Sequence, residues 1–321
     1  MSRRTVLVTG AAGFLGSATA EALLRRGDHV RGIDSFDPFY DPAIKHRNLE
    51  EVREAGELPV VEGDIRDPAA VREAIRGCDA VVHMAARAGV RPSFEDPFGY
   101  ADVNFRGTAV VLDEARRAGV RTFVAASSSS VYGARKDTPF REDDPCDRPA
   151  SPYAATKRAM EVLCAERQAA DGGDLCCLRL FTAYGPRQRP EMAISLFARA
   201  IEEGRPVPVF GDGGARRDYT FVDDIADGVL RALDRSRGFA ILNLGGARAT
   251  SLAELVVLLE AALGRKAAIE RHPEQRGDVP VTLADTARAR AALGWEPRTT
   301  LEEGLRRFAA WLRARPVAVR P

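Results

Sequence analysis

Three glycines near the N-terminus constrain the fold of this chain most strongly. Gly10, Gly13 and Gly16 follow a short β-branched run at residues 5–9 and precede an amphipathic stretch, residues 17–26, that ends at a further glycine. This order predicts a strand, a tight turn and a helix. Glycine lets the backbone approach a ligand closely, and the N-terminus of a helix attracts a pyrophosphate. The spacing differs from the G-x-G-x-x-G pattern, and three glycines can also form a purely structural turn.

Asp34 helps to decide between a nucleotide-binding turn and a structural one. It stands at the end of a second predicted strand, residues 29–33, and 18 residues after Gly16. A carboxylate in this place accepts hydrogen bonds from the adenosine ribose hydroxyls and repels a 2′-phosphate. No arginine adjoins Asp34 to bind such a phosphate. The sequence therefore predicts NAD rather than NADP, and the alternative is a helix-capping aspartate in a loop.

Strands and helices alternate along the first 180 residues without internal repeats. The predicted strands are 4–9, 29–33, 58–62, 79–84, 120–126 and 174–180. The predicted helices are 14–26, 43–55, 68–76, 97–118 and 152–170. Such alternation is typical of a parallel sheet with helices on both faces, and ligands bind at the carboxyl ends of its strands. After residue 180 the elements shorten, and prolines and glycines increase.

We therefore expect an α/β fold with a doubly wound parallel sheet of the Rossmann type and a smaller C-terminal α/β lobe. The nucleotide-binding domain should comprise residues 1–180, and the substrate lobe residues 181–321. The segment 219–243 should return to the first domain. A chain of 321 residues exceeds one typical domain, which agrees with two lobes.

Charge and composition argue against several classes of protein. The 47 basic and 46 acidic residues leave a net charge of +1, so the chain has no signature of nucleic-acid binding. It has no run of 18 apolar residues and no signal-peptide core, which argues against a membrane span and secretion. Five cysteines, an odd number, indicate reduced thiols and a cytoplasmic protein. Four scattered histidines and no C-x-x-C motif predict no metal site.

A tyrosine and a lysine four residues apart are the strongest sign of catalysis. Tyr153 and Lys157 fall in the predicted helix 152–170, where residues i and i+4 share a face. A free tyrosine has a pKa of about 10, whereas a general base at neutral pH needs a pKa near ~7. Such a shift requires roughly 4 kcal/mol of phenolate stabilisation, which a nearby ammonium can supply in a partly dry site. The alternative is an exposed helix on which this spacing has no function.

Together these motifs resemble an extended short-chain dehydrogenase/reductase, more narrowly the NAD-dependent sugar-nucleotide epimerases, and most of all the UDP-glucuronate 4-epimerases. The glycine turn, Asp34, a run of four serines and the Tyr153/Lys157 pair occur in the family's order, and the similarity spans residues 4–312. The resemblance implies a Rossmann domain, a tightly held NAD and a C-terminal lobe for a nucleotide sugar. Asparagine is unfavourable inside a buried helix, so Asn104 could also cap or kink a turn. Besides Tyr153 and Lys157, the implied cofactor-binding residues are Gly10, Gly13, Phe14, Leu15, Gly16, Asp34, Asp64, Ile65, Ala85, Ala86 and Asn104.

The same resemblance assigns the catalytic groups. Tyr153 corresponds to the base that takes the proton of the sugar O4, Ser128 to the hydroxyl that positions O4, and Lys157 to the lysine that holds the nicotinamide ribose. Related dehydratases and decarboxylases carry acidic residues where this chain has Ser129 and Ser130. Without an acid there, elimination and acid-assisted decarboxylation lose their chemistry. The reaction expected is epimerisation at C4 by oxidation, rotation of the keto-sugar and reduction.

A loop after residue 180 should determine which sugar binds. A hexuronate carries a C6 carboxylate, and a guanidinium can bind it through two parallel hydrogen bonds. Arg189, with Thr182 as a polar contact, is the candidate for this role, and Arg187 is the competitor. Arg217 matches the family's phosphate-binding arginine, and Asp278 belongs to the segment that closes over the nucleotide. The substrate-binding residues expected are Ser128, Ser129, Thr182, Arg189, Arg217 and Asp278.

Several alternatives stay open at this point. A UDP-glucose 4-epimerase, or another sugar-nucleotide epimerase, would use the same motifs. A UDP-glucuronate decarboxylase and a non-catalytic NAD-binding regulator are less favoured. Gln275 stands where a hexose epimerase is expected to carry arginine, and the neighbouring Arg276 could replace that arginine.

Apolar stripes on two helices predict a homodimer. Helices 97–118 and 152–170 each carry apolar residues besides those that should face the sheet. Two such pairs of helices would form a four-helix interface about a twofold axis, as the resemblance also implies. The alternative is a stripe that is fully used against the sheet. The residues concerned are Val103, Val110, Val111, Met160, Leu163 and Cys164.

Overall fold

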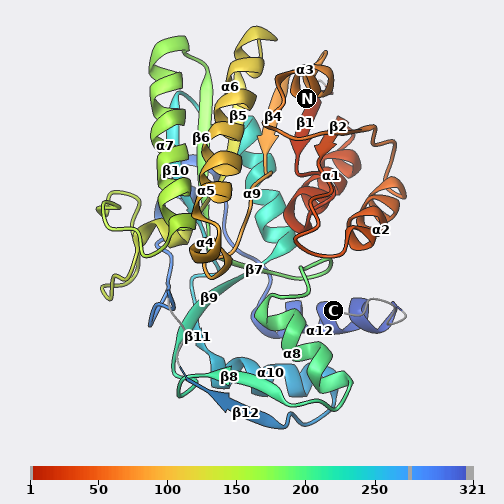
Figure 1. Ribbon diagram of the computed structural model, residues 1–321, viewed down its shortest axis with the longest axis vertical. Coiled ribbons are helices and arrows are strands. Elements are labelled where there is room, and N and C mark those ends of the chain that lie inside the picture. The colour runs from red at the N-terminus through yellow and green to blue at the C-terminus, as the bar shows by residue number, and fades with distance from the viewer. Residues whose placement is uncertain (1–2, 274–276, 316–321) are drawn as a thin grey trace.

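The computed structural model describes residues 3–273 and 277–315. Its centre is a seven-stranded sheet in the order β10-β6-β5-β4-β1-β2-β3, in which every neighbouring pair is parallel (Figure 1). β1 and β4 consist almost wholly of apolar and β-branched residues, as expected for strands that are covered on both faces. The strands are β1 (Thr5–Thr9), β2 (His29–Asp34), β3 (Val60–Glu62), β4 (Ala80–His83), β5 (Thr122–Ser128), β6 (Asp174–Leu180) and β10 (Phe239–Leu244).

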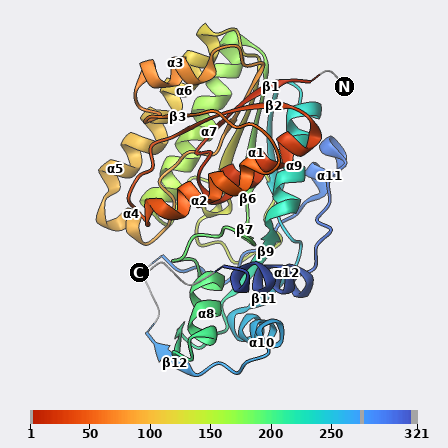
Figure 2. The same cartoon turned by 90° about the vertical axis from the view of Figure 1, so that its right-hand side faces the viewer.

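Helices cover both faces of this sheet, as Figures 1 and 2 show. On one face lie α1 (Phe14–Arg26), α2 (Pro42–Arg53) and α9 (Val222–Arg235). On the other face lie α3 (Pro68–Ile75), α6 (Gly107–Arg117) and α7 (Pro152–Asp171). Successive side chains of β1 alternate between the two cores, because Val6 and Val8 pack with the first group and Leu7 packs with the second. The doubly wound α/β fold predicted from the sequence is confirmed.

The predicted helix 97–118 is interrupted. It consists of α5 (Pro97–Ala101), a π-helical turn η1 (Asp102–Arg106) and α6, and the short helix α4 (Pro92–Glu95) precedes it. The π-turn contains Asn104, whose side chain bonds to the backbone of Arg87 instead of pointing to solvent. A π-turn inserts one residue into a helix, and such turns are frequent at functional sites. A single uninterrupted helix was therefore the wrong prediction, and the irregularity lies at Asn104, where a cap or a kink was considered.

A smaller α/β lobe lies below the large sheet in Figure 1. Its strands form a three-stranded sheet, β11-β9-β7, and a two-stranded sheet, β12-β8. The strands are β7 (Thr182–Tyr184), β8 (Val207–Phe210), β9 (Arg216–Phe221), β11 (Ala249–Ser251) and β12 (Ile269–His272). The helices after β6, besides α9, are α8 (Ala193–Glu202), α10 (Leu252–Leu263), α11 (Ala287–Leu293) and α12 (Leu301–Arg313).

The chain passes between the large sheet and the smaller lobe more than once. Within the predicted returning segment, β10 pairs with β6 in the large sheet, whereas β9 pairs with β7 and β11 in the smaller lobe. The division into domains at residue 180 stays a prediction. Within the described ranges, no helix is both long enough and apolar enough to cross a membrane.

Candidate active site

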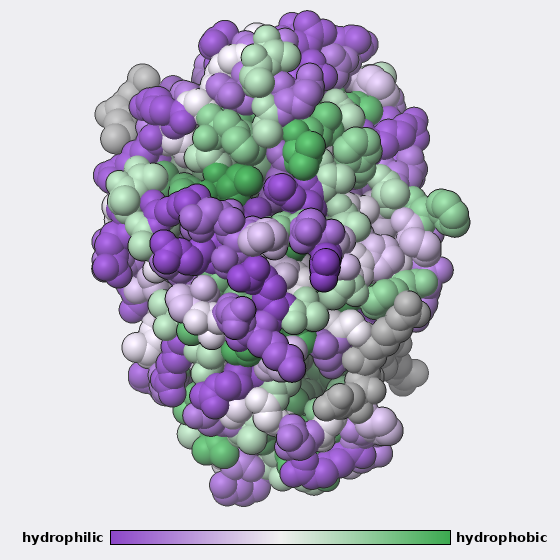
Figure 3. Space-filling view, turned by 90° about the vertical axis from the view of Figure 1, so that its left-hand side faces the viewer, coloured by the Kyte–Doolittle hydropathy of each residue, from purple (hydrophilic) through white to green (hydrophobic). Residues whose placement is uncertain are grey.

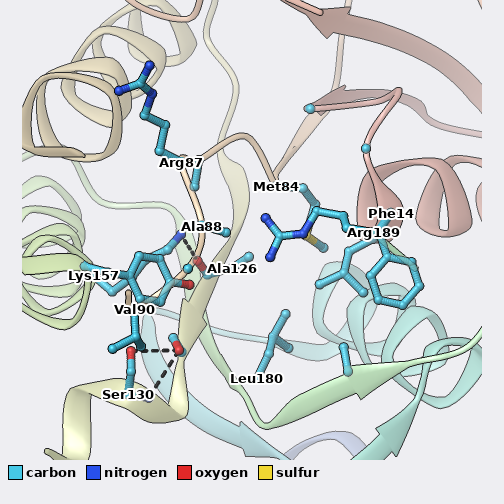
Figure 4. Close-up of a pocket in the computed structure, with 18 of the residues that line it drawn as sticks. Phe14, Met84, Arg87, Ala88, Val90, Ala126, Ser130, Lys157, Leu180 and Arg189 are labelled. Carbon is cyan, nitrogen blue, oxygen red and sulfur yellow. Dashed lines mark hydrogen bonds between the residues drawn. The ribbon is translucent and has the colours of Figure 1, made fainter. Parts of the chain in front are cut away.

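A large cavity lies at the carboxyl ends of the sheet strands. Its volume is about 770 Å³, and its walls come from the turns after β1, β2, β4 and β5 and from loops of the smaller lobe. Figure 4 shows side chains from these segments converging on it. In a parallel α/β sheet this edge is where ligands bind, because the loops there are free of the packed core.

The glycine turn after β1 has the geometry that a bound pyrophosphate requires. Gly10 has φ of 68°, and a Cβ there would lie 2.9 Å from the backbone of Ala85. A Cβ on Gly16 would lie 1.9 Å from the carbonyl oxygen of Gly10. Gly13 caps α1 without a side-chain hydrogen bond. The N-terminus of α1 can therefore offer N–H groups and its dipole to an anion in the cavity.

Asp34 lies at the end of β2 and lines the cavity, as predicted. Its carboxylate accepts hydrogen bonds from the amides of Ala12, at 3.0 Å, and Phe36, at 2.9 Å. Lys45 of α2 places its Nζ 3.8 Å from Asp34 Oδ1 and donates to the carbonyl oxygen of Asp37. This cation was not predicted, because only the residues adjacent to Asp34 bore on the choice between NAD and NADP. No local pattern points to it, because Lys45 reaches Asp34 only through the packing of α2.

The other residues expected to contact the cofactor fall into two groups. Asp64, Ile65, Ala85 and Ala86 line the cavity, as do Phe14 and Leu15. The hydrogen bond from Arg66 lowers the pKa of Asp64 and keeps it ionised. Asn104, in contrast, lies behind the cavity wall. Protein groups bind its side-chain amide, and contact of Asn104 with a cofactor stays a prediction.

The amide of Asn104 links three segments around the cavity. Its Oδ1 accepts from the amide of Arg87 at 2.8 Å, and its Nδ2 donates to the carbonyl oxygen of Arg87 at 2.9 Å. The same Nδ2 lies 3.0 Å from the hydroxyl of Thr156 on α7. This amide therefore holds the loop after β4 against the helix that carries Tyr153, so its contribution is to the shape of the cavity.

Tyr153, Ser128 and Lys157 lie together on the cavity wall, as predicted. α7 begins one residue before Tyr153, and its N-cap, Ser151, accepts a hydrogen bond from the amide of Ala154 at 3.1 Å. This cap fixes the first helical turn, on which the phenol is carried. The phenol is hydrogen-bonded to Ser128, the last residue of β5.

Burial affects the pKa of both Tyr153 and Lys157. Burial raises the pKa of Tyr153, and the hydrogen bond with Ser128 and the charge of Arg189 oppose that rise only in part. Lys157 donates from Nζ to the carbonyl oxygen of Ala126 at 2.7 Å, and burial lowers its pKa to about 8. The ammonium of Lys157 is thus bound to β5, and the expected lowering of the phenol pKa by Lys157 stays a prediction.

The two candidate arginines of the loop after β7 are clearly separated. Arg189 lines the cavity, and in Figure 4 its guanidinium extends toward the cavity centre. Its Nε pairs with Glu191 at 3.1 Å. Arg187 does not line the cavity, and its guanidinium forms an ion pair with Glu21 of α1 instead. The guanidinium of Arg187 thus does not face the cavity, and Arg189 stays the candidate for the ligand contact.

The remaining predicted substrate contacts also line the cavity. They are Ser129, Thr182, Arg217 and Asp278, of which Arg217 and Asp278 come from the smaller lobe. Arg217 Nη2 lies 4.0 Å from Asp278, and Arg91, from the loop after β4, lies 3.1 Å from the same carboxylate. Arg91 was not predicted from the sequence, because it belongs to no recognisable motif. Gln275 and Arg276 lie outside the described residues.

The cavity residues fit a dinucleotide at one end. Such a ligand needs three features, and all are present. They are a glycine turn in which a Cβ would collide with the backbone, a helix N-terminus without a side-chain cap, and a carboxylate at the end of β2. In the residues that the structure describes, no group of three or more His, Cys, Asp or Glu side chains could hold a metal ion.

Comparisons with known proteins agree with this geometry. The model of the NAD dependent epimerase/dehydratase family matches residues 6–245. A UDP-glucuronate 4-epimerase of Thermodesulfobacterium geofontis is 41% identical over 308 residues, which cover 95% of each chain. The structure of UDP-glucuronic acid 4-epimerase from Bacillus cereus in complex with UDP-glucuronic acid and NAD is 32% identical, with a TM-score of 0.91 and coverage of 97% and 99%.

A hexose enzyme is also similar to the chain. UDP-glucose 4-epimerase from Thermotoga maritima, solved with UDP-glucose, is 30% identical with a TM-score of 0.89, and the match covers 97% of this chain and 99% of that one. The resemblance stated from the motifs is thereby confirmed. This chain belongs to the NAD-dependent epimerase/dehydratase family of extended short-chain dehydrogenases/reductases.

Proposed function

We propose that this chain is an NAD-dependent UDP-glucuronate 4-epimerase, an isomerase that interconverts UDP-glucuronate and UDP-galacturonate. The observation that carries the proposal is that one cavity holds both the Tyr153–Ser128 pair and the guanidinium of Arg189. The pair can move a proton at O4 of a hexose ring, and the guanidinium can bind a carboxylate at C6 of the same ring. The activities named for the relatives from T. geofontis and B. cereus support the same reaction.

Ser128 is oriented for proton transfer. Its Oγ accepts hydrogen bonds from the amide of Ser130 at 3.1 Å and from the hydroxyl of Ser130 at 2.9 Å. These donors leave the Ser128 proton to point at Tyr153 or at O4. Ser128 therefore positions O4, and Tyr153 takes the O4 proton during oxidation and returns it during reduction.

The cofactor and the lysine complete the reaction. When bound, NAD supplies a hydride acceptor and donor at C4 and a positive charge beside the phenol. The glycine turn and Asp34 would hold its adenosine diphosphate half, and Lys157 would hold its nicotinamide ribose. Because burial alone raises the pKa of Tyr153, ionisation of the phenol depends on the cationic groups brought near it.

Arg189 gives the proposal its preference for a uronate over a hexose. Oxidation at C4 of a uronate creates a β-keto acid, which loses CO₂ when the bond to the carboxylate is perpendicular to the carbonyl plane. A planar guanidinium that binds the carboxylate through two hydrogen bonds holds that bond nearer the plane. Thr182 and Ser129 supply further polar contacts, and Arg217 and Asp278 would bind the diphosphate and nucleotide at the other end of the cavity.

A product assay tests the proposal directly. Purified protein should convert UDP-glucuronate to UDP-galacturonate, with UDP-pentose as a minor product, when the reaction is followed by chromatography. The Tyr153→Phe variant should retain NAD and lose roughly 10²–10⁴-fold in turnover, the scale of a lost general base. Absence of UDP-galacturonate with the wild-type protein, together with turnover of UDP-glucose, would show a hexose epimerase instead.

We also propose a cytoplasmic homodimer. All five cysteines are buried free thiols, which supports a reducing compartment. Three of the residues expected in the interface are not available for it. Val111, Met160 and Cys164 are buried in the core against the sheet. The apolar side chains that do face outward on the same helices are Phe98, Phe105 and Val162, which are 87%, 41% and 54% exposed.

The exposed apolar residues of α5, η1 and α7 support the four-helix interface. Figure 3 views the molecule from the side on which α7 lies and shows apolar side chains gathered among polar ones in its upper half. Exposed apolar patches of this kind mark association sites. The dimer is thus proposed on a different set of residues from the one that the helical periodicity indicated.

A further inference from the structure

Two arginines separated by one residue point in opposite directions in the loop after β7. Arg189 reaches into the cavity, whereas Arg187 is 9% exposed and points to the helices beside the nucleotide-binding turn. The change of direction between the two side chains coincides with a left-handed backbone conformation at Arg187, where φ is 67°. Arginine rarely adopts this conformation, so it persists only where the surroundings hold it in place.

The partner of Arg187 is Glu21. The Arg187 Nη2 contacts Glu21 Oε2 on α1, and Glu51 of α2 lies 3.9 Å from Nε. Among the described residues, Nε and Nη1 of Arg187 find no hydrogen-bond partner. Glu21 therefore provides the principal contact of this buried guanidinium. The contact ties the loop to the two helices that follow β1 and β2.

Gln188 secures the peptide between the two arginines. It is 3% exposed, its Nε2 donates to the carbonyl oxygen of Ala183 at 2.9 Å, and its Oε1 accepts from the hydroxyl of Ser195 at 3.1 Å. The carbonyl oxygen of Arg189 then accepts from the amide of Met192 at 3.2 Å. These hydrogen bonds hold the backbone on both sides of the Gln188–Arg189 peptide, so the torsion angles at Arg187 affect where the Arg189 side chain begins.

We propose that the Arg187–Glu21 ion pair is a positioning device that sets the direction of Arg189, and through it the recognition of the hexuronate carboxylate. The inference rests on the proposed function, because it concerns the contact that distinguishes a uronate from a hexose. Arg187 and Glu21 touch neither substrate nor cofactor in this scheme. Groups that support a binding residue determine whether its geometry is good enough to act, and a misplacement of about 1 Å can cost ~10²-fold in rate.

Three variants test the device. Glu21→Gln removes the charge that holds Arg187 and keeps the shape of the side chain. Arg187→Gly removes the guanidinium while keeping a backbone that readily adopts positive φ. Arg25→Ala is the matched control, because Arg25 forms the other ion pair of Glu21, at 2.5 Å, and is exposed. The holoenzyme is used throughout, with bound NAD measured in each preparation.

Affinity for UDP-glucuronate is compared with affinity for UDP, which has no carboxylate. Glu21→Gln and Arg187→Gly should weaken UDP-glucuronate binding by about tenfold or more and leave UDP binding within about twofold, since a free arginine side chain loses orientation but the nucleotide contacts persist. The ratio of UDP-pentose to UDP-galacturonate among the products should rise in both variants. Arg25→Ala should match the wild type in all these measurements.

Two results overturn the inference. If Arg187→Gly binds UDP-glucuronate as tightly as the wild type and gives the same product ratio, the side chain does not position Arg189. If Glu21→Gln loses affinity for UDP and UDP-glucuronate to the same extent, the ion pair has only a general structural role. A wild-type protein that forms UDP-galacturonate keeps the proposed function intact in both cases, whereas a wild type that forms no UDP-galacturonate removes the function and the inference together.

Discussion

Replacing Glu161 by glutamine should destabilise the protein severely, because the carboxylate is the partner of a buried arginine. Glu161 on α7 is 0% exposed, and Arg179 on β6 is 1% exposed. The pair is bidentate, with Arg179 Nε 2.8 Å from Oε1 and Nη2 2.9 Å from Oε2. Ser127 donates to Oε1 at 2.6 Å, and Arg158 donates to Oε2 at 3.0 Å.

The size of the stability loss depends on which of these contacts glutamine can replace. The amide retains one oxygen for Ser127, but it presents an NH₂ group to Arg179 and leaves that guanidinium uncompensated. Breaking a buried ion pair from one side costs about 3–5 kcal/mol, and the half-exposed Arg158 contact adds little. A chain of 321 residues has an unfolding entropy of about 0.7 kcal/mol/K, so Tm should fall by about 4–7 °C.

Denaturant unfolding of the wild type, Glu161→Gln and a control measures this change. Glu166→Gln is the matched control, because Glu166 is exposed on the same helix and should change stability by less than about 0.5 kcal/mol. The double variant Glu161→Leu/Arg179→Met removes both charges and should regain most of the loss, since apolar replacements of a buried pair are often neutral.

The pH dependence provides a second measurement of the same pair. Burial alone would raise the pKa of Glu161, but the hydrogen bonds and charge of Arg179 outweigh burial and hold the pKa below its ordinary value. A depressed carboxyl pKa contributes stability above the unfolded value of about 4.3 and loses it as pH falls. The difference in the free energy of unfolding between the wild type and Glu161→Gln should therefore become smaller below about pH 4. A gap of under about 1 kcal/mol at pH 7, or a double variant as unstable as the single one, would refute this reasoning.

Two further outcomes are expected. Arg189→Ala should reduce UDP-glucuronate turnover by an amount equal to about 2–5 kcal/mol while bound NAD stays unchanged, and Arg189→Lys should restore only part of it because an ammonium cannot make the planar fork. Equal turnover by Arg189→Ala and the wild type would contradict the assignment. Light scattering at micromolar concentration should give twice the 34.8 kDa of one chain, and Phe98→Asp should shift the particle toward one chain; a wild-type monomer would exclude the dimer.

The amino-acid sequence was sufficient for features that depend on neighbouring residues. The helix 14–26 and the strand 174–180 have the predicted bounds, because the period of apolar residues and the flanking glycines are local properties. The glycine turn and the Tyr153–Lys157 spacing also led to a cavity lined by both residues. Each of these motifs lies within one strand–turn–helix unit or one helix face, so its geometry follows directly from its spacing.

Tertiary structure decided where individual side chains point. The spacing of Arg187 and Arg189 could not show which faces the cavity, because a positive φ and a contact with α1 determine their directions. Lys45 meets Asp34 only because α2 packs against α1 next to the end of β2, and Lys157 donates to the backbone of β5. These contacts join residues that are distant in the chain or lie in irregular loops, and there the direction of a side chain depends on long-range packing that no periodicity records.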